Sequence, residues 1–203
     1  MRSNQFYTFS SKLSSSAIQA HAISLNKEED ENGFFDQHKL IQGAFEGDYP
    51  IVFKQEYGSK LEDVLDTGWP SLFLISNQMK ILLEENKLTG WSAFSVKLLG
   101  KNNKEIDGYH GLSIQGRTGK IDFSQSKIIE KRLGGNTPLS EYYLGMDVNL
   151  DEWDGSDFFL PENSFEILVT GRTAEILKKS KFTNIRLENI ETIEIPIFAL
   201  KKD

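Results

Sequence analysis

Residues 72–90 read LFLISNQMKILLEENKLTG, and this stretch contains the signals of a strand, a capped helix and a turn. The continuous apolar run before Ser76 has the length of a buried strand. Ser76 suits a helix N-cap, because its hydroxyl can accept a hydrogen bond from a free backbone N–H of the first turn. Met79 and Leu83 follow at helical spacing, and Gly90 suits a left-handed terminating turn. The stretch predicts a strand followed by an amphipathic helix.

The same order of signals returns 94 residues later, where residues 166–184 read EILVTGRTAEILKKSKFTN. Thr170 takes the place of the cap Ser76, and Ile176 stands where Leu82 stood. Asn184 replaces Gly90, and Asn is the next best residue for a left-handed turn. Because cap, helix face and turn agree in one register, the pattern favours an internal duplication over a chance similarity between two amphipathic helices.

The predicted fold class is therefore α+β. Two related strand–helix–strand units, about 72–99 and 165–199, would flank a strand-rich middle segment, residues 101–148. That segment is punctuated by glycines and predicts short, mostly antiparallel strands, although residues 127–132 fit a strand or a helix. With no long linker, we expect a single domain over residues 1–203, with a module at 61–203 and a poorly defined part at 1–60. Within that part, residues 10–22 fit a helix or an edge strand.

Composition places the 203 residues among ordinary globular chains, with 38% hydrophobic and 26% charged residues. Cysteine is absent, which excludes disulfides, thiolate zinc sites and cysteine nucleophiles. No apolar run approaches the length of about 18 residues that a membrane helix needs. Polar residues at 10–16 occupy the place of a signal-peptide apolar stretch, so we expect a cytoplasmic protein with no membrane partner.

Charge is unevenly distributed along the chain. The net charge of −7 argues against a general nucleic-acid binder. Residues 133–171 contain no Lys, Arg or His and include these carboxylates: Glu141, Asp147, Asp151, Glu152, Asp154, Asp157, Glu162 and Glu166. This pattern fits solvated loops, whose charge aids solubility, and it equally fits an acidic face that attracts a basic partner.

The motifs of common catalytic and metal sites are incomplete. Residues 116–120 read GRTGK, but a phosphate-binding loop would need Gly at position 114 and Ser or Thr at position 121, which are both Ile. Asp147, Asn149 and Asp151 match the first ligands of a calcium loop, yet its sixth position is Glu152 instead of Gly. No two of His21, His38 and His110 share a metal-ligand spacing, and His110 has no identifiable catalytic partner. We expect no catalytic residues, cofactor or metal.

The most distinctive string is WDGSDFF at residues 153–159. Asp154 and the following Gly supply a turn, Asp157 can bond to nearby backbone N–H groups, and Trp153 and Phe158 would anchor the turn on the core. The alternative is a binding loop in which Trp153 stacks on a ligand. The candidate residues for a partner-binding or structural loop are Trp153, Asp154, Asp157, Phe158, Asp147, Asp151 and Glu152.

Residues 61–90, with the string LEDVL at 61–65 and Gly68, together with residues 153–184, resemble a family of predicted bacterial immunity proteins. Those proteins are associated with polymorphic toxin systems. The resemblance implies a non-enzymatic module that binds and neutralises a cognate toxin. A basic toxin would match the acidic stretches of the chain. It carries over no catalytic and no toxin-contacting residues, and it implies that residues 153–159 determine the fold.

Two other functions stay open at this point. The chain could be a small-ligand or carbohydrate-binding or carbohydrate-active protein that uses Trp69, Trp91 or Trp153 as stacking platforms beside Asp154 and Asp157. It could also be a structural subunit of a larger assembly. The oligomeric state is left open.

Overall fold

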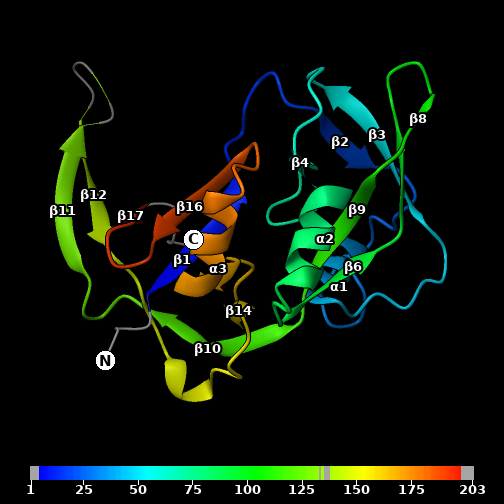
Figure 1. Cartoon of the computed structure of the whole chain (residues 1–203). Helices are drawn as coiled ribbons and strands as arrows, with labels where there is room; N and C mark the ends of the chain where they lie inside the picture. Colours follow the sequence, from blue (N-terminus) through cyan, green and yellow to red (C-terminus); the bar gives the residue numbers. More distant parts are fainter. Residues whose placement is uncertain (1–4, 133, 135–137, 198–203) are drawn as a thin grey trace.

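The structure is a computed structural model of the 203-residue chain, and it describes residues 5–132, 134 and 138–197. Its helices are α1 (Asp36–Gln42), α2 (Asn77–Glu85) and α3 (Gly171–Lys179), and a 3-10 turn, η1, spans Leu150–Glu152. Strands form the rest of the regular structure, so the predicted α+β class is confirmed. Figure 1 shows α2 and α3 each beside its own sheet, with a separate three-stranded sheet at one end of the molecule.

The larger sheet has the order β6-β9-β5-β4-β2-β3-β7-β8. Its strands are β2 (Gln19–Ala22), β3 (Ile51–Tyr57), β4 (Val64–Asp66), β5 (Phe73–Ser76), β6 (Trp91–Phe94), β7 (Val96–Leu99), β8 (Glu105–Ile106) and β9 (Tyr109–Ile114). The pattern that predicts one strand up to residue 99 is divided at Ser95 into β6 and β7. Because these consecutive strands lie near opposite ends of the sheet order, the sheet must curl back on itself.

The second sheet has the order β13-β10-β14-β15-β1-β16. It contains β1 (Phe6–Ser11), β10 (Gly116–Asp122), β13 (Asp147–Val148), β14 (Phe158–Glu162), β15 (Leu168–Thr170) and β16 (Ile185–Asn189). The three-stranded sheet, called the arm below, consists of β11 (Lys127–Arg132), β12 (Leu139–Leu144) and β17 (Glu194–Pro196). Residues 127–132 are therefore a strand. Most pairings are antiparallel, but β10 runs parallel to β14 across the middle of the second sheet.

One continuous apolar core joins the two large sheets. Phe53 and Leu74 of the first sheet and Phe9, Phe158 and Val169 of the second belong to the same buried cluster. Neighbouring residues of a strand point to opposite faces, so Phe159 and Leu168 face the other side of the second sheet. There they form a smaller cluster that also contains Phe6, Met146 and Ile190.

Residues 10–22, which fit a helix or an edge strand by sequence, are neither. They contain the end of β1 and all of β2, and both strands lie inside a sheet. β1 pairs with β15 and β16, whereas β2 pairs with β3 and β4 of the other sheet. The first 60 residues thus supply central strands to both sheets. β2 and β3 pair with each other, and the other strands that pair with β1, β2 and β3 lie outside this segment.

Both predicted helices begin where their caps indicate. The hydroxyl of Ser76 accepts a hydrogen bond from Met79 N at 3.2 Å, and the hydroxyl of Thr170 accepts one from Thr173 N at 3.3 Å. The helices end earlier than predicted, because Lys87 already has a positive φ of 51°, as has Lys181 at 56°. The later positions 90 and 184 are also left-handed.

Gly90 has a second reason to be glycine. A Cβ at this position would lie 2.0 Å from the carbonyl oxygen of Phe158, which leaves no room for a side chain. At the corresponding position of the other half, Asn184 instead donates its side-chain N–H to the carbonyl oxygen of Val64 at 2.7 Å. Each helix-terminating turn therefore contacts the first residue of a strand in the other sheet, Phe158 of β14 or Val64 of β4.

Two aspartates make these crossed contacts stronger. Asp63 accepts a hydrogen bond from the cap Ser76 at 2.9 Å, and it also accepts bonds from the backbone N–H and hydroxyl of Thr183, both at 2.9 Å. Asp157 does the same with the cap Thr170 at 3.1 Å and with the backbone N–H of Thr89 at 3.0 Å. Each carboxylate thus binds the helix start of its own half and the helix end of the other.

The strand–helix–strand order predicted for residues 72–99 and 165–199 is present in both segments, with residues 198–199 outside the described part. The register also corresponds: Val64 faces Ile75 in the first sheet, and Phe158 faces Val169 in the second. These are geometric correspondences between two halves.

We predict that Asp157→Ala lowers the free energy of unfolding by about 3 kcal/mol, because buried donors lose a charged acceptor. Asp63 is more exposed than Asp157, which is 8% exposed, so Asp63→Ala should cost less. Urea unfolding measures both. As the control, Asp151→Ala on the surface should change stability by less than about 0.5 kcal/mol. Equal stability of the wild type and Asp157→Ala would contradict the role given to this carboxylate.

Candidate functional site

The string at residues 153–159 is tied into the fold at both ends. The ring of Trp153 meets Phe6 edge-on, with ring centroids 5.3 Å apart, and lies 5.6 Å from Phe159. Its indole N–H donates to the carbonyl oxygen of Ser156 at 3.2 Å. Phe158 is completely buried in the core that joins the two sheets. The aromatic residues of the string therefore pack inside the protein.

The two aspartates of the string are also engaged. Asp154 accepts hydrogen bonds from the backbone N–H groups of Arg117 and Ser156, both at 2.9 Å. Asp157 holds the two helix ends described above and is approached by Arg172 at 3.4 Å. These contacts favour the structural interpretation of the string over the binding-loop interpretation.

Asp147, Asp151 and Glu152, the remaining candidates, are exposed. Asp147 lies directly opposite Asp122 in the pairing of β13 with β10. No ion pair is found for either carboxylate within the part of the chain that the structure describes. Like charges directly opposite each other on paired strands are destabilising, so this pair costs the fold some stability.

The arm contains a second pair of this kind. Glu130 on β11 lies opposite Glu141 on β12, and both are exposed without an ion pair among the described residues. Ile128 and Leu139 lie on the same face of the arm as these carboxylates and are 52% and 53% exposed. β11 is also an outer strand of the arm. This face therefore combines two carboxylates with exposed apolar side chains, and Arg132, opposite Leu139, adds one positive charge to it.

An aromatic stack joins the arm to the acidic end of the second sheet. Phe123, directly after Asp122, stacks on Tyr143 of β12 with ring centroids 4.8 Å apart and ring planes inclined by 16°. The two carboxylate pairs consequently belong to neighbouring parts of one surface, which we call the acidic surface: Asp122, Glu130, Glu141, Asp147, Asp151 and Glu152.

The tryptophans differ in their surroundings. The indole N–H of Trp91 donates to the carbonyl oxygen of Leu88 at 2.9 Å, so Trp91, like Trp153, is satisfied within its own loop. Trp69 instead lines a pocket, and its indole N–H has no acceptor among the described residues. Trp69, one of the three proposed stacking platforms, therefore lies beside a cavity.

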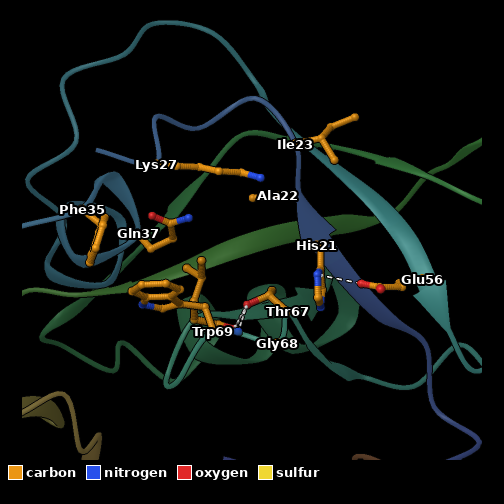
Figure 2. Close-up of a pocket in the computed structure, with 11 residues that line it drawn as sticks. His21, Ala22, Ile23, Lys27, Phe35, Gln37, Glu56, Thr67, Gly68 and Trp69 are labelled. Atoms are coloured by element: carbon orange, nitrogen blue, oxygen red, sulfur yellow. Dashed lines mark hydrogen bonds and ion pairs between the residues drawn. The ribbon is translucent and has the colours of Figure 1, made fainter. Parts of the chain in front are cut away.

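The pocket has a volume of about 620 Å³ and lies between α1, β2, β3 and the loop that joins β4 to β5. Its most prominent polar feature is His21, whose Nδ1 lies 2.7 Å from a carboxylate oxygen of Glu56 (Figure 2). Gly68 touches the other edge of the imidazole, where a Cβ would lie 2.3 Å from Nε2. The ring of His21 is thereby held between a carboxylate and a backbone turn.

A cluster of rings supports one wall of the pocket. His38 of α1 stacks on Phe165 at a centroid distance of 4.5 Å and meets Trp69 at 5.4 Å. Its Nδ1 accepts a hydrogen bond from the backbone N–H of Phe35 at 3.2 Å, which keeps this nitrogen unprotonated. Burial lowers the pKa of His38, although the nearby Glu29 opposes the shift.

These groups do not form a recognisable catalytic arrangement. Thr67, the one hydroxyl that lines the pocket, already donates to the carbonyl oxygen of Leu72 at 2.7 Å. His110, the histidine with the most plausible sequence context, lies 3.4 Å from the side-chain oxygen of Asn77, and burial lowers its pKa. Over residues 5–132, 134 and 138–197, no group of His, Asp and Glu side chains is arranged to hold a metal ion.

Sequence reasoning missed the contact between His21 and Glu56. The two residues are separated by 35 positions and meet because β2 pairs with β3, where His21 lies opposite Lys54. An alternating strand pattern around His21 could have indicated a strand, but not its partner.

No known family model matches the chain, and a search of curated proteins finds no similar sequence. In the described part of the chain, the helices are too short and too polar to cross a lipid bilayer.

We predict that Trp153→Ala lowers the free energy of unfolding by about 3 kcal/mol, since the cavity removes ring contacts with Phe6 and Phe159. Trp153→Phe keeps much of the packing and should cost about 1 kcal/mol. Thermal and urea unfolding measure both variants. An unchanged melting temperature for Trp153→Ala would favour a binding loop instead.

We also predict a loss of stability in mild acid that depends on His38. Below its ordinary pKa of about 6.5, the unfolded chain takes up a proton that the folded chain resists, so the free energy of unfolding falls as the pH falls. The loss should level off once the pH is below the pKa of the folded state. Urea unfolding between pH 7.5 and pH 5 measures it, and His38→Gln removes this contribution. A wild type and a His38→Gln variant with the same pH dependence would exclude the effect.

Proposed function

We propose that the chain is a non-enzymatic protein-binding module that binds and neutralises a cognate bacterial toxin. The observation that carries the proposal is the presence of two carboxylate pairs on paired strands, Asp122 with Asp147 and Glu130 with Glu141. A fold that retains like charges opposite each other gives up stability at both places. A basic partner would turn this repulsion into attraction, which explains why such pairs would be kept.

Exposed charges of this kind mainly act on the rate of association. Electrostatic attraction steers a basic partner toward an acidic surface and is screened beyond about 10 Å at moderate salt. The affinity itself would come from a few buried contacts. Ile128 and Leu139 are suitable anchors, because they are large, apolar, exposed and adjacent to the carboxylates. The outer edge of β11 could add main-chain hydrogen bonds to a strand of the partner.

The immunity role itself rests on the family resemblance of residues 61–90 and 153–184. The resemblance implies a toxin as the partner, and the acidic surface favours a basic partner, so we expect a basic protein toxin. The proposal includes a cytoplasmic location, where an immunity protein would meet a toxin that acts inside the cell, and it includes no nucleic-acid or membrane partner.

The correspondence between the halves supports a proposal about origin. We infer that the units around α2 and α3 descend from one duplicated unit. The support is the constant offset of 94 residues between Asp63 and Asp157, Ser76 and Thr170, and Thr89 and Thr183, which make equivalent hydrogen bonds.

A single charge reversal tests the acidic surface. Glu141→Lys replaces the repulsion with Glu130 by an attraction, so we expect the free energy of unfolding to rise by about 0.5 kcal/mol. The same change should slow association with the toxin, most strongly at low salt. Replacing Asp147, Asp151 and Glu152 by the corresponding amides should slow association as well and leave the fold intact. Surface plasmon resonance at two salt concentrations measures the rates.

Glu31→Lys is the matched control, because it makes the same change of net charge on an exposed loop away from the acidic surface. It should leave the association rate nearly unchanged. Co-expression with a toxin whose gene neighbours the gene of this chain tests the immunity role directly. Unprotected cells, together with no complex between the purified proteins, would exclude it.

A further inference from the structure

The pocket between α1 and the β4–β5 loop contains hydrogen-bond donors that the protein itself does not use. Figure 2 shows the ammonium group of Lys27 and the amide nitrogen of Gln37 pointing toward the middle of the pocket. Neither donor has an acceptor among the described residues. The amide oxygen of Gln37 is also buried without a partner, and this acceptor would need a donor group on the ligand. The indole N–H of Trp69, which also lines the pocket, likewise has no acceptor among the described residues. Unused donors that converge on a cavity favour a ligand that carries an acceptor.

The charges around the pocket favour an anion among the ligands that carry a hydrogen-bond acceptor. Glu56 is the one acidic side chain that lines the pocket, and His21 already binds it at 2.7 Å. Asp30, on the loop next to Lys27, is bound by Lys39 at 3.0 Å. Lys27 has no ion pair within the described part of the chain, so its positive charge is available to a ligand.

The side chains that form the walls of the pocket indicate which chemical group carries the anionic charge of the ligand. Phe35 and Trp69 meet at a centroid distance of 5.4 Å with ring planes 73° apart, so they form an aromatic corner. Leu72 and Ala22 supply further apolar surface. A volume of about 620 Å³ suits a small organic molecule. A flat ring can stack in such a corner, because aromatic rings pack face to edge and face to face.

The pocket is also held in shape before any ligand arrives. His38 and Phe165 stack behind Trp69, and Gly68 locks the imidazole of His21 in place. Rigid walls reduce the entropy that a ligand must overcome on binding.

We propose that this pocket binds a small aromatic anion, with its ring against Trp69 and Phe35 and its carboxylate or phosphate at Lys27 and Gln37. The site lies apart from the acidic surface and does not depend on the proposed toxin binding.

The test uses the isolated full-length chain and two probes that share this chemistry. Indole-3-acetate carries a carboxylate and adenosine monophosphate carries a phosphate, so the two titrations distinguish the two sources of the anion. Indole-3-acetamide lacks the charge, and inorganic phosphate lacks the ring. At least one of the two aromatic anions should bind saturably with a dissociation constant of about 1 mM or tighter, and the two partial ligands should bind at least about tenfold more weakly.

The chain has 3 Trp residues, so the indole N–H signals in a ¹⁵N spectrum give a local readout. The signal of Trp69 should move on titration, while those of Trp91 and Trp153, which are hydrogen-bonded inside their loops, should stay. The two unmoved signals also show that the fold is intact in each variant.

Lys27→Met retains the apolar stem of the side chain and removes the charge, and it should weaken binding about tenfold or more. Gln37→Leu should weaken binding too. Lys12→Met, an equal charge change at an exposed position outside the pocket, is the control and should have no effect. No saturable movement of the Trp69 signal with either anion would overturn the proposal. Equal binding of the acetamide, or equal weakening by Lys12→Met, would overturn it as well. Lys27→Met should still bind the toxin, so a failure here leaves the proposed function untouched.

Discussion

The crossed hydrogen bonds of Asp63 and Asp157 are the constraint on which the rest of the structure depends. Each carboxylate caps the helix of its own half and accepts hydrogen bonds from the turn that ends the helix of the other. Separating the halves would leave both carboxylates and the threonine turns at residues 89 and 183 without these partners. Because unpaired buried polar groups are costly, this arrangement fixes how the two sheets meet. The apolar core that runs between the sheets adds stability, but it has no comparable directionality.

The path of the chain reinforces this junction. β1 lies in the second sheet and continues into β2 of the first, while β9 of the first sheet continues into β10 of the second. β1 pairs with β15 as β9 pairs with β5: Tyr7 faces Val169, and His110 faces Ile75. The strand that completes the second half therefore comes from the beginning of the chain and not from its end. Two covalent crossings and two hydrogen-bonded ones hold the same interface. The strands of the first sheet all lie within residues 19–114, whereas the second sheet takes β1 from the beginning of the chain and its other strands from after residue 115.

This topology explains what the sequence could and could not predict. The caps Ser76 and Thr170 and the helix faces after them are local signals, and they predict both helices well. The sequence predicts the end of each helix too late, because Lys87 and Lys181 adopt left-handed conformations that glycine or asparagine would more commonly take. Strand partners are not local. The first 60 residues therefore contain few local signals of their fold, and the pocket at His21 depends on the pairing of β2 with β3, which are separated in the sequence by α1.

Burial also distinguishes the acidic residues that stabilise the fold from those that lie exposed on the arm. Asp157 is nearly buried and holds the halves together by hydrogen bonds, and Phe158 is fully buried and does so by apolar packing. Glu130 and Glu141 face each other in solvent, where an exchange of one charge would stabilise the arm. A sequence selected for stability alone would not keep such a pair, whereas it would keep Asp157. Residue type and sequence spacing alone do not distinguish Asp157 from Glu130 and Glu141, since all three are acidic residues. What distinguishes them is whether the local energy is favourable: the hydrogen bonds of Asp157 stabilise the fold, whereas the facing carboxylates of the arm repel each other.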